Sequence, residues 1–576
     1  MSDDTGTADA DAPSAAARTA TAPVTGPAPA TGGASSPAHR AYDAAEAWAQ
    51  RFVGWLVGPG APWAVVLLTA WSVYLRTRNL EAPFWIDEGI SVGVADHSFA
   101  GIPDALRLDG NPPTYYWLLH GWISLFGNGE ASAHTLSMLF SVATVPVTWW
   151  LTRGPLGRRS ALAATAMAAV LPYLTYFAQE TRMYSMVALL SVLVAGLHLH
   201  VFSEGARRRS QIGLAIVLIV ALYTHSWSVF LVGGSVVAVG VRALLEPDGA
   251  ARRRVVRIGF LIHAAAAVAW APWVPTLLRQ ADETGAPWSL KPTFQMLVES
   301  IGSLAVRPAQ ATILLTAMVF GFGALAAAAR GRFRGRGIPD PELARSIFRH
   351  GTVLAAMFVA IALFAFGSSL MNPAWANRYM GVLVGPLVLL SATVLTRSGR
   401  VTLGILLVLL VMWGVDTQGD RLHSKGSPVP VADAVAPHLR EGDLVISIHP
   451  EQLTVIHYYL RDRGAPEGVR YATALGRQSD VRLFDWRHAM DRLTAAEPWR
   501  VARRLIDDQP EGSRVLLVLP VTSTGNWQGP WTRLVADRSR AWKALLQTDP
   551  RLRMVGRRPV QGPGRGVYGV LFDVGP

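Results

Sequence analysis

Two adjacent carboxylates, Asp87 and Glu88, come just after the first long apolar run of the chain and follow the apolar residues Phe84-Trp85-Ile86. A carboxylate at a membrane boundary is costly unless it has a function or a partner. Such a side chain could act as a general base that takes the proton from an acceptor hydroxyl. The alternative is structural, namely a helix cap or an ion pair with Arg76 or Arg78.

A third carboxylate, Glu180, interrupts a long apolar stretch and is closely followed by Arg182. If Glu180 faces Asp87 across a cavity, it could orient an acceptor while Arg182 binds an anion. The alternative is a local Glu–Arg pair at a helix end, which contributes little stability. Asp87, Glu88 and Glu180 could together hold a divalent metal ion, which is the one cofactor the sequence leaves open, although no histidine belongs to this set.

Aromatic residues follow the turn Asn111-Pro112-Pro113, which cannot continue a helix because proline lacks a donor and restricts the residue before it. Tyr115 and Tyr116 after this turn are either anchors at the membrane interface or one wall of a sugar site. His225 lies at a turn between two apolar runs, as a polar turn residue or as a site residue.

A second arginine, Arg378, stands in the stretch Asn377-Arg378-Tyr379 before a late apolar run. Its forked donors could bind a phosphate group. The alternative is a side chain that anchors the helix end by reaching toward the interface.

The composition indicates that these residues lie between membrane-spanning helices. Of 576 residues, 51% are hydrophobic and 16% are charged, well below the usual quarter of charged residues. The apolar residues form repeated runs of about 20, long enough to cross a bilayer. The chain is therefore predicted to be a mainly α, polytopic membrane protein. Cysteine is absent, which excludes a disulfide framework and a Cys metal site.

The net charge of +13 does not predict binding to nucleic acid, because the arginines cluster in short loops between apolar runs, as the positive-inside rule describes. Eleven spans are predicted, at about residues 62–80, 131–151, 161–178, 183–202, 212–223, 227–245, 258–278, 311–329, 353–370, 379–395 and 401–415. Residues 115–126 are short for a crossing and are predicted to form an interfacial helix. With eleven spans, every Arg cluster falls on the cytoplasmic side of the membrane, and the amino terminus lies inside as well. The clusters are at residues 153–159, 207–209, 252–254, 330–336 and 397–400.

The two ends of the chain differ from this pattern. Residues 1–40 are rich in Ala, Thr, Pro, Gly and Ser and are predicted to be a disordered cytoplasmic tail. A short amphipathic segment, 41–56, could lie along the membrane surface. It opens a transmembrane domain over 41–416, which a soluble extracytoplasmic α/β domain over 420–576 follows. In that domain strands are expected at 444–448, 515–520 and 567–574, and helices at 451–461, 487–495 and 531–546.

Together these motifs resemble the GT-C superfamily of integral-membrane glycosyltransferases, and in particular the protein mannosyltransferase and aminoarabinose transferase group, glycosyltransferase families 39 and 83. The resemblance covers about residues 62–400 and rests on the order and spacing of five short motifs. These are Asp87-Glu88, the turn Asn111-Pro-Pro-Thr-Tyr-Tyr, the loop Leu156-Gly-Arg-Arg, the stretch Gln179-Glu-Thr-Arg-Met-Tyr and the stretch Asn377-Arg-Tyr. The turn departs from the family pattern, because Asn111 stands where members often have His.

The resemblance implies a sugar transfer, usually with inversion, from a polyprenyl-phosphate carrier to an acceptor at the outer face of the plasma membrane. The acceptor would be a lipid, a glycan or a protein. Asp87 matches the position of the family's catalytic base, and Glu180 matches its second acidic position. Glu88, next to Asp87, would complete the catalytic set. Arg182, Arg378 and Tyr379 would hold the donor phosphate. The substrate-binding residues would be Asn111, Tyr115, Tyr116, Tyr184 and His225.

Three other functions compete with this one. A transporter or flippase of lipid-linked sugars would show ionisable residues deep in its spans and internal symmetry, and neither is visible here. A membrane-anchored glycan-binding scaffold would leave the carboxylates of two separate loops without a reason. A glycan polymerase or ligase of the same superfamily is poorly separated by sequence.

Overall fold

The computed structural model describes residues 37–203, 207–305, 307–332, 341–522, 527–558 and 566–575. Most of the predicted disordered tail, residues 1–36, lies outside the described residues, and so do Arg334 and Arg336 of the fourth Arg cluster. The chain divides into two compact units, residues 1–56 and 57–576. In the first unit, the predicted amphipathic segment falls within the helix α1 (Pro37–Val57).

In the second unit, each predicted span corresponds to one helix or to consecutive helices. These are α2 (Ala61–Arg76), α6 (Glu130–Thr152), α7 (Gly157–Val170) with α8 (Pro172–Phe177), α9 (Tyr184–Ser203), α10 (Arg208–Leu222), α11 (Ser228–Leu244), α12 (Gly249–Trp270) with η1 (Ala271–Trp273) and α13 (Val274–Glu283), α15 (Pro308–Ala329), α16 (Pro341–Met371), η2 (Asn377–Met380) with α17 (Gly381–Arg397), and α18 (Arg400–Gly414). Among the described residues, six single helical segments are long and apolar enough to cross a membrane. The chain is thus a polytopic membrane protein of mainly helical fold, as predicted.

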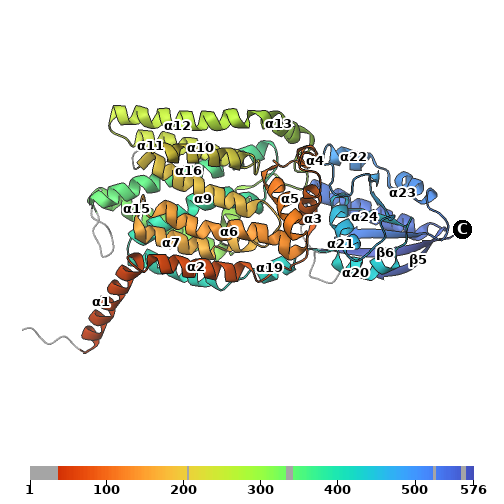
Figure 1. Ribbon diagram of the computed structural model, residues 1–576, viewed down its shortest axis with the longest axis horizontal. Coiled ribbons are helices and arrows are strands. Elements are labelled where there is room, and N and C mark those ends of the chain that lie inside the picture. The colour runs from red at the N-terminus through yellow and green to blue at the C-terminus, as the bar shows by residue number, and fades with distance from the viewer. Residues whose placement is uncertain are drawn as a thin grey trace, which may run out of the picture. The chain divides into compact units, whose positions relative to one another are not determined.

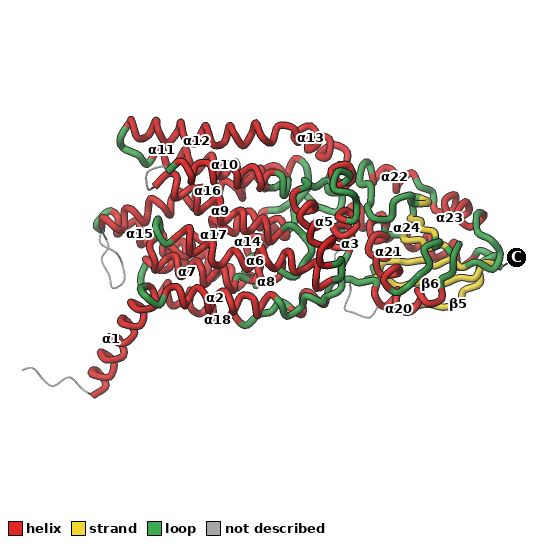
Figure 2. The backbone as a smooth tube through the Cα atoms, viewed as in Figure 1, coloured by secondary structure: helices red, strands yellow, loops and turns green. Residues whose placement is uncertain are grey.

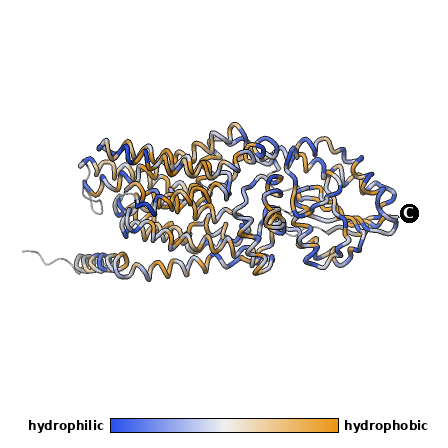
Figure 3. Tube along the Cα trace, turned by 45° about the horizontal axis from the view of Figure 1, so that its top comes forward, coloured by the Kyte–Doolittle hydropathy of each residue, from blue (hydrophilic) through white to orange (hydrophobic). Residues whose placement is uncertain are grey.

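The bundle is built around α9 and α17, whose residues are almost all buried. Helix α9 packs against α6, α10 and α17, and α11 packs along α16. The bundle helices are mainly hydrophobic, as Figure 3 shows. The α11–α12 connection and the carboxyl-terminal end of α15, which adjoin Arg-rich sequence, lie at the end of the bundle away from the sheet (Figure 1).

Short helices lie between the bundle and the carboxyl-terminal sheet (Figure 1). They include α3 (Ile86–Ala95), α4 (Ile102–Asp109), α5 (Thr114–Phe126) and α19 (Gly419–His423), whereas the short helix α14 (Phe294–Ser303) packs against α15. Helix α5 begins directly after Pro113 and has 13 residues, so the short helix predicted there is present.

Helix α3 is held close to the carboxyl-terminal region because it lacks side chains at Gly89 and Gly93. A Cβ atom at Gly89 would lie 2.5 Å from Cβ of Val455, and one at Gly93 would lie 2.0 Å from the carbonyl oxygen of Arg482. The four-residue spacing places both glycines on one helix face. The carboxyl-terminal region therefore fixes the helix on which the two adjacent carboxylates lie.

The carboxyl-terminal region is a six-stranded sheet with helices packed on it (Figure 2), and the strand order is β3-β2-β1-β4-β6-β5. Strand β1 is parallel to its neighbours β2 and β4, whereas the other pairings are antiparallel. The strands are β1 (Leu444–Ser447), β2 (Arg470–Thr473), β3 (Gly476–Arg477), β4 (Arg514–Pro520), β5 (Leu552–Arg558) and β6 (Val567–Val574). The helices are α20 (Val429–Val435), η3 (Ala436–His438), η4 (Pro450–Gln452), α21 (Leu453–Asp462), α22 (Ala489–Ala495), α23 (Pro498–Asp507) and α24 (Pro530–Thr548).

The three predicted strands and three predicted helices of this region are present as β1, β4, β6, α21, α22 and α24, with ends that differ by a few residues. Five further elements, β2, β3, β5, α20 and α23, are present but were not predicted from the sequence. Strands β2 and β3 are short, and the exposed side chains in β5 leave no long apolar pattern. The β1–β4 register pairs Leu444 with Val515, so two strands that are almost entirely buried run side by side.

Candidate active site

The site begins at the amino-terminal end of α3, where Asp87 and Glu88 occupy the first turn. Carboxylates are favourable there because the helix dipole presents positive charge. Glu88 also accepts a hydrogen bond from the backbone N–H of Trp85, at 3.3 Å, and so caps the helix. Adjacent helical residues point in different directions, and Asp87 lines a cavity whereas Glu88 is fully buried.

The cavity has a volume of about 320 Å³ and lies between the end of the bundle and the sheet region. One group of its lining residues comes from the bundle end and its loops: Trp85, Ile86, Asp87, Ile90, Asp109, Gly110, Asn111, Arg182, His225, Ser226, Trp227, Gly285, Ala286, Trp288, Ala374, Arg378 and Tyr379. The other group comes from the carboxyl-terminal region: His449, Glu451, Trp486, Trp531 and Thr532. Residues distant in sequence thus line one cavity.

Asp87 faces a strongly basic wall of this cavity. Its Oδ2 atom lies 3.6 Å from Nη1 of Arg378 and has no hydrogen-bond partner among the described residues. The guanidinium group of Arg378 lies over the rings of Trp85 and Tyr379, at 5.9 and 5.5 Å from their centroids. The Asp87 carboxylate is therefore held near a positive charge, and its Oδ2 atom makes an ion pair without a hydrogen bond.

Arg182 is the second cation at this wall and is fixed by three acceptors. Its Nη1 donates to the backbone oxygen of Asp87 at 3.2 Å, to Oγ of Ser91 at 3.1 Å and to the hydroxyl of Tyr116 at 3.2 Å. These bonds tie the loop after α8 to α3 and α5. The ion pairs of Asp87 and Glu88 with Arg76 that sequence allowed do not form, because Arg76 donates instead to backbone oxygens of α6 and α7.

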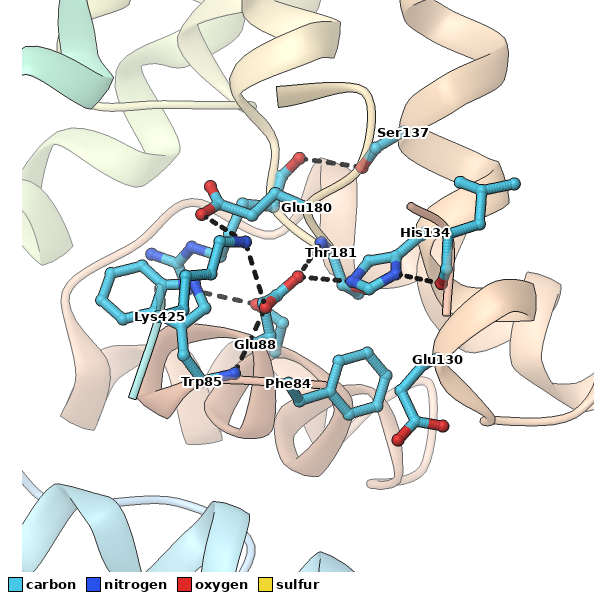
Figure 4. A network of polar contacts seen from close by, with 12 residues as sticks. Phe84, Trp85, Glu88, Glu130, His134, Ser137, Glu180, Thr181 and Lys425 are labelled. Carbon is cyan, nitrogen blue, oxygen red and sulfur yellow. Dashed lines mark hydrogen bonds and ion pairs between the residues drawn. The ribbon is translucent and has the colours of Figure 1, made fainter. Parts of the chain in front are cut away.

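Glu88 and Glu180 belong to a buried network beside the cavity (Figure 4). Oε1 of Glu88 accepts the backbone N–H of Thr181 at 2.8 Å and lies 2.6 Å from Nε2 of His134. The ammonium group of Lys425 lies 3.5 Å from Oε2 of Glu88 and 3.0 Å from Oε1 of Glu180. One cation thus lies between two carboxylates that neither solvent nor the cavity reaches.

The opposite charges of this network shift the pKa values of its members. Burial would raise the pKa of Glu88, but the charge of Lys425 and the contacts with His134 and Thr181 lower that pKa to about 2. Burial would lower the pKa of Lys425, but Glu180 and Glu88 raise it. Burial and the neighbouring Glu88 raise the pKa of Glu180, against the opposing effect of Lys425. Glu88 and Lys425 are thus both charged at neutral pH.

The predicted metal set does not converge on one point. Asp87 lies on the cavity with Arg378, whereas Lys425 stands between Glu88 and Glu180. Within the ranges that the structure describes, no group of three or more His, Cys, Asp or Glu side chains is arranged to hold a metal ion. A divalent ion bound by Glu88 and Glu180 would have to displace the ammonium group.

The predicted substrate-binding residues divide into two groups. Asn111 and His225 line the cavity, whereas Tyr115, Tyr116 and Tyr184 are buried and do not line it; Tyr379, from the predicted donor-phosphate set, also lines the cavity. Tyr115 and Tyr116 support the wall from behind, because the Tyr115 hydroxyl lies 2.9 Å from Oγ of Ser137 and the Tyr116 hydroxyl accepts from Arg182. The Tyr184 ring lies 5.7 Å from the guanidinium carbon of Arg182.

A carboxylate that sequence reasoning missed, Asp109, also lines the cavity. Its Oδ2 accepts a hydrogen bond from Nδ2 of Asn111 at 2.7 Å. Burial raises the pKa of Asp109, while Arg182 and Asn111 oppose that change. The cavity wall near Arg182 thus carries two carboxylates, Asp87 and Asp109.

Further residues of the site were not found from sequence, although some carried a signal. The chain has only three lysines, Lys291, Lys425 and Lys543, in an otherwise arginine-based set, so a lysine close after the last span was unusual. His134 and Glu451 did not stand out in the sequence. His134 lies near the start of a helix and Glu451 follows a strand, and polar residues are common at both places. Their partners become visible only in three dimensions.

Residues 110–276 match the family model described as dolichyl-phosphate-mannose-protein mannosyltransferase. The fold is similar to that of ArnT from Cupriavidus metallidurans in the apo state, with 16% identity and a TM-score of 0.56 over 89% of this chain and 98% of that chain. It is also similar to the apo oligosaccharyltransferase of Archaeoglobus fulgidus, with 12% identity and a TM-score of 0.50 over 84% of this chain and 73% of that chain. No curated protein matches the sequence significantly.

The chain is thus an integral-membrane protein whose fold is similar to those of ArnT and the archaeal oligosaccharyltransferase. This similarity and the family model over residues 110–276 agree with the resemblance that the motifs predicted. Residues 110–276 are the stretch that matches the dolichyl-phosphate-mannose-protein mannosyltransferase model. That segment contains Asn111, Glu180, Arg182 and His225, whereas Asp87 and Arg378 lie outside it.

Proposed function

We propose that this protein is a glycosyltransferase that moves a sugar, a hexose or a pentose, from a polyprenyl-phosphate carrier to an acceptor hydroxyl, with inversion. The observation that carries the proposal is the surroundings of Asp87. Its carboxylate lines a cavity together with two arginines, and its Oδ2 atom, 3.6 Å from Nη1 of Arg378, has no hydrogen-bond partner within the described residues. The name of the family that matches residues 110–276 supports a lipid-phosphate sugar as the donor.

The proposed reaction uses these groups in one displacement. Asp87 accepts the proton of the acceptor hydroxyl as its oxygen forms a bond to the anomeric carbon of the sugar. The bond between that carbon and the phosphate oxygen breaks, and the electron pair leaves with the lipid phosphate. Arg182 and Arg378 stabilise the charge that develops on the phosphate, because fixed cations in an enclosed site need little reorganisation. Tyr379 helps to hold Arg378 in place.

Glu88 and Glu180 act in this proposal as positioning residues. Glu88 joins the start of α3 to His134 of α6 and to Thr181 of the loop that carries Arg182. Lys425 joins the same carboxylate to Glu180. The network therefore fixes the relative positions of Asp87 and Arg182 without contacting a substrate.

The proposed orientation places the cavity and the sheet region at the outer face of the plasma membrane, with the amino terminus inside. Arg-rich connections gather at the other end of the bundle (Figure 1), and short loops with many arginines favour the cytoplasmic side. A lipid-phosphate donor suits an outer site, because the carrier brings the activated sugar through the membrane. Partners in this proposal are the lipid-linked donor, an acceptor bearing a hydroxyl group and the membrane lipids.

The test uses the purified full-length protein in lipid with a panel of polyprenyl-phosphate sugars and a membrane extract as the acceptor source. Release of polyprenyl phosphate together with a new glycosidic product is expected for at least one donor. Nucleotide sugars are the matched control and are expected to give no product. Product from nucleotide sugars alone, or no product from any lipid-phosphate donor, would overturn the proposal.

A further inference from the structure

The cavity has a second wall that the proposed displacement does not use, and the sheet topology explains where it lies. His449 and Glu451 follow the carboxyl end of β1, and Trp531 and Thr532 follow that of β4. The chain leaves β1 toward β2 on one side and later returns to β4 on the other side. In open α/β sheets, ligands bind at such a switch point, outside the carboxyl ends of the strands.

Polar groups at this switch point are buried and incompletely paired. Glu451 is 6% exposed. Its Oε1 accepts the indole N–H of Trp531 at 2.8 Å and lies 2.7 Å from Nε2 of His449. Its Oε2 has no hydrogen-bond partner within the described part of the chain, and neither does the indole nitrogen of Trp288. Buried polar atoms normally have partners, so two unpaired ones on one cavity indicate groups that a ligand satisfies.

Aromatic surface adjoins these polar atoms. The rings of Trp288 and Trp486 lie 4.8 Å apart between centroids, and Trp486 lies 5.2 Å from Trp531. Trp288 is only half-buried and comes from the loop after α13, whereas the other two come from the carboxyl-terminal region. An indole ring offers a large, rigid apolar face together with one donor.

We propose that this wall is the acceptor subsite and that it binds a sugar ring of the acceptor, with Glu451 accepting hydrogen bonds from its hydroxyl groups and Trp288 covering its apolar face. A sugar ring combines several hydroxyl donors with a face of C–H groups, which matches a carboxylate beside an indole. A phosphate group does not match this wall, because a carboxylate repels it, and the arginines lie at the Asp87 wall instead. The inference rests on the proposed glycosyl transfer and narrows its acceptor to a glycan or glycolipid.

The cavity size agrees with such a ligand. At about 320 Å³, the space is at the lower end of the range of roughly 300–1,000 Å³ that small-molecule sites occupy. Because Asp87 and Glu451 line the same cavity, a ring held by Glu451 can present another hydroxyl group toward the base. The acceptor is thus recognised by the sheet region and deprotonated by α3.

The experiment measures binding rather than turnover, with methyl glycosides of common hexoses and pentoses as probes. Saturation-transfer NMR on the full-length protein in nanodiscs is expected to show saturable binding of at least one glycoside. Glu451→Gln should weaken that binding at least 10-fold. Glu467→Gln, an exposed position of the same region, should leave it unchanged. A short peptide rich in Ser and Thr is expected not to compete.

The possible outcomes distinguish failure of the proposed sugar subsite from failure of the proposed glycosyl transfer. Binding of the peptide but of no glycoside would overturn the sugar subsite and leave the proposed transfer standing with a protein acceptor. Glycoside binding that Glu451→Gln and Trp288→Ala both leave unchanged would also overturn it. Glycoside binding without use of any lipid-phosphate donor would support the subsite and overturn the transfer. Both variants should keep the thermal midpoint of the wild type, which shows that lost binding is not lost folding.

Discussion

The ammonium group of Lys425 lies 3.0 Å from a carboxylate oxygen of Glu180 and 3.5 Å from one of Glu88, with all three side chains nearly inaccessible to solvent. Lys425 lies between α19 and α20, where the chain passes from the bundle to the sheet region. The carboxylates come from α3 and from the loop before α9. One ion-pair cluster therefore joins three distant parts of the chain beside the Asp87 wall.

Removing this cation should destabilise the protein and misplace Arg182. Lys425→Met would leave two buried carboxylates without a cation, and breaking a buried ion pair costs about 3–5 kcal/mol. We expect a clearly lower thermal midpoint in detergent together with reduced transfer. Lys291→Met, at an exposed position, is the matched control. Adding Glu180→Gln to Lys425→Met should restore part of the stability, and no restoration would contradict the pairing.

The stability of the protein should fall in acid because of Glu88. Its pKa is lowered from 4.5 to about 2 in the folded protein, so the stabilisation is complete above the unfolded pKa and is lost as the pH falls toward the folded pKa. Thermal midpoints measured from about pH 6 to about pH 3 should therefore decline less steeply for Glu88→Gln than for the wild type. Glu441→Gln, which is exposed, should keep the wild-type slope. Equal slopes for the wild type and Glu88→Gln would refute the assignment.

Loss of the base should stop transfer without stopping donor binding. Asp87→Asn removes the proton acceptor, and a general base typically contributes about 10²–10⁴-fold to the rate. We expect kcat to fall by about that factor, with polyprenyl-phosphate binding retained because Arg182 and Arg378 remain. Asp104→Asn, on the exposed side of α4, should keep full activity. Wild-type turnover in Asp87→Asn would sink the assignment of the base.

The paired N–H donors of the Arg378 guanidinium group should contribute more to use of the donor substrate than its positive charge alone. Arg378→Lys keeps the charge but not the paired donors of the guanidinium group. A hydrogen bond to a charged group contributes about 1.5–3 kcal/mol, so kcat/KM for the donor should fall about 10-fold or more. The control is Arg307→Lys, at an exposed position before α15. If Lys at 378 supports normal donor use, a bidentate phosphate contact is not needed.

Close contact between α3 and the sheet region should not tolerate a methyl group. Gly93→Ala would bring a Cβ atom to 2.0 Å from the backbone oxygen of Arg482, and overpacking typically costs about 1–3 kcal/mol. We expect both stability and transfer to decline, because α3 carries Asp87. Gly121→Ala in α5 has open space around the new atom and should be neutral or slightly stabilising. The comparison is made by thermal unfolding and by initial rates.

Local sequence patterns predicted much of this fold. Long apolar runs with arginines between them predicted the bundle helices, and Pro112-Pro113 predicted the start of α5, because these signals are local. The strands β2 and β5 were missed because they are short or partly exposed, and their identity depends on pairing with β1 and β6.

The candidate site was predictable only where a residue type was unusual in its surroundings. Asp87, Arg182 and Arg378 stood out against apolar sequence, and the structure places all three on one cavity. Which carboxylate faces the cavity was not predictable, because Asp87 and Glu88 differ only by the rotation of one helical residue. The role of Glu451 depends on the sheet topology, which pattern and propensity do not encode.

The position of Lys425 also bears on biosynthesis. During translation, the residues that build the Asp87 wall, up to Arg378, emerge well before the lysine that neutralises Glu88 and Glu180. Contacts between residues far apart in the sequence form slowly in folding. A nascent chain that has inserted its first helices thus holds two buried carboxylates without their cation, until the last span and the segment after it have docked. A prematurely terminated product would accordingly lack the ion-pair cluster beside the Asp87 wall, even if nearly all of its membrane helices were in place.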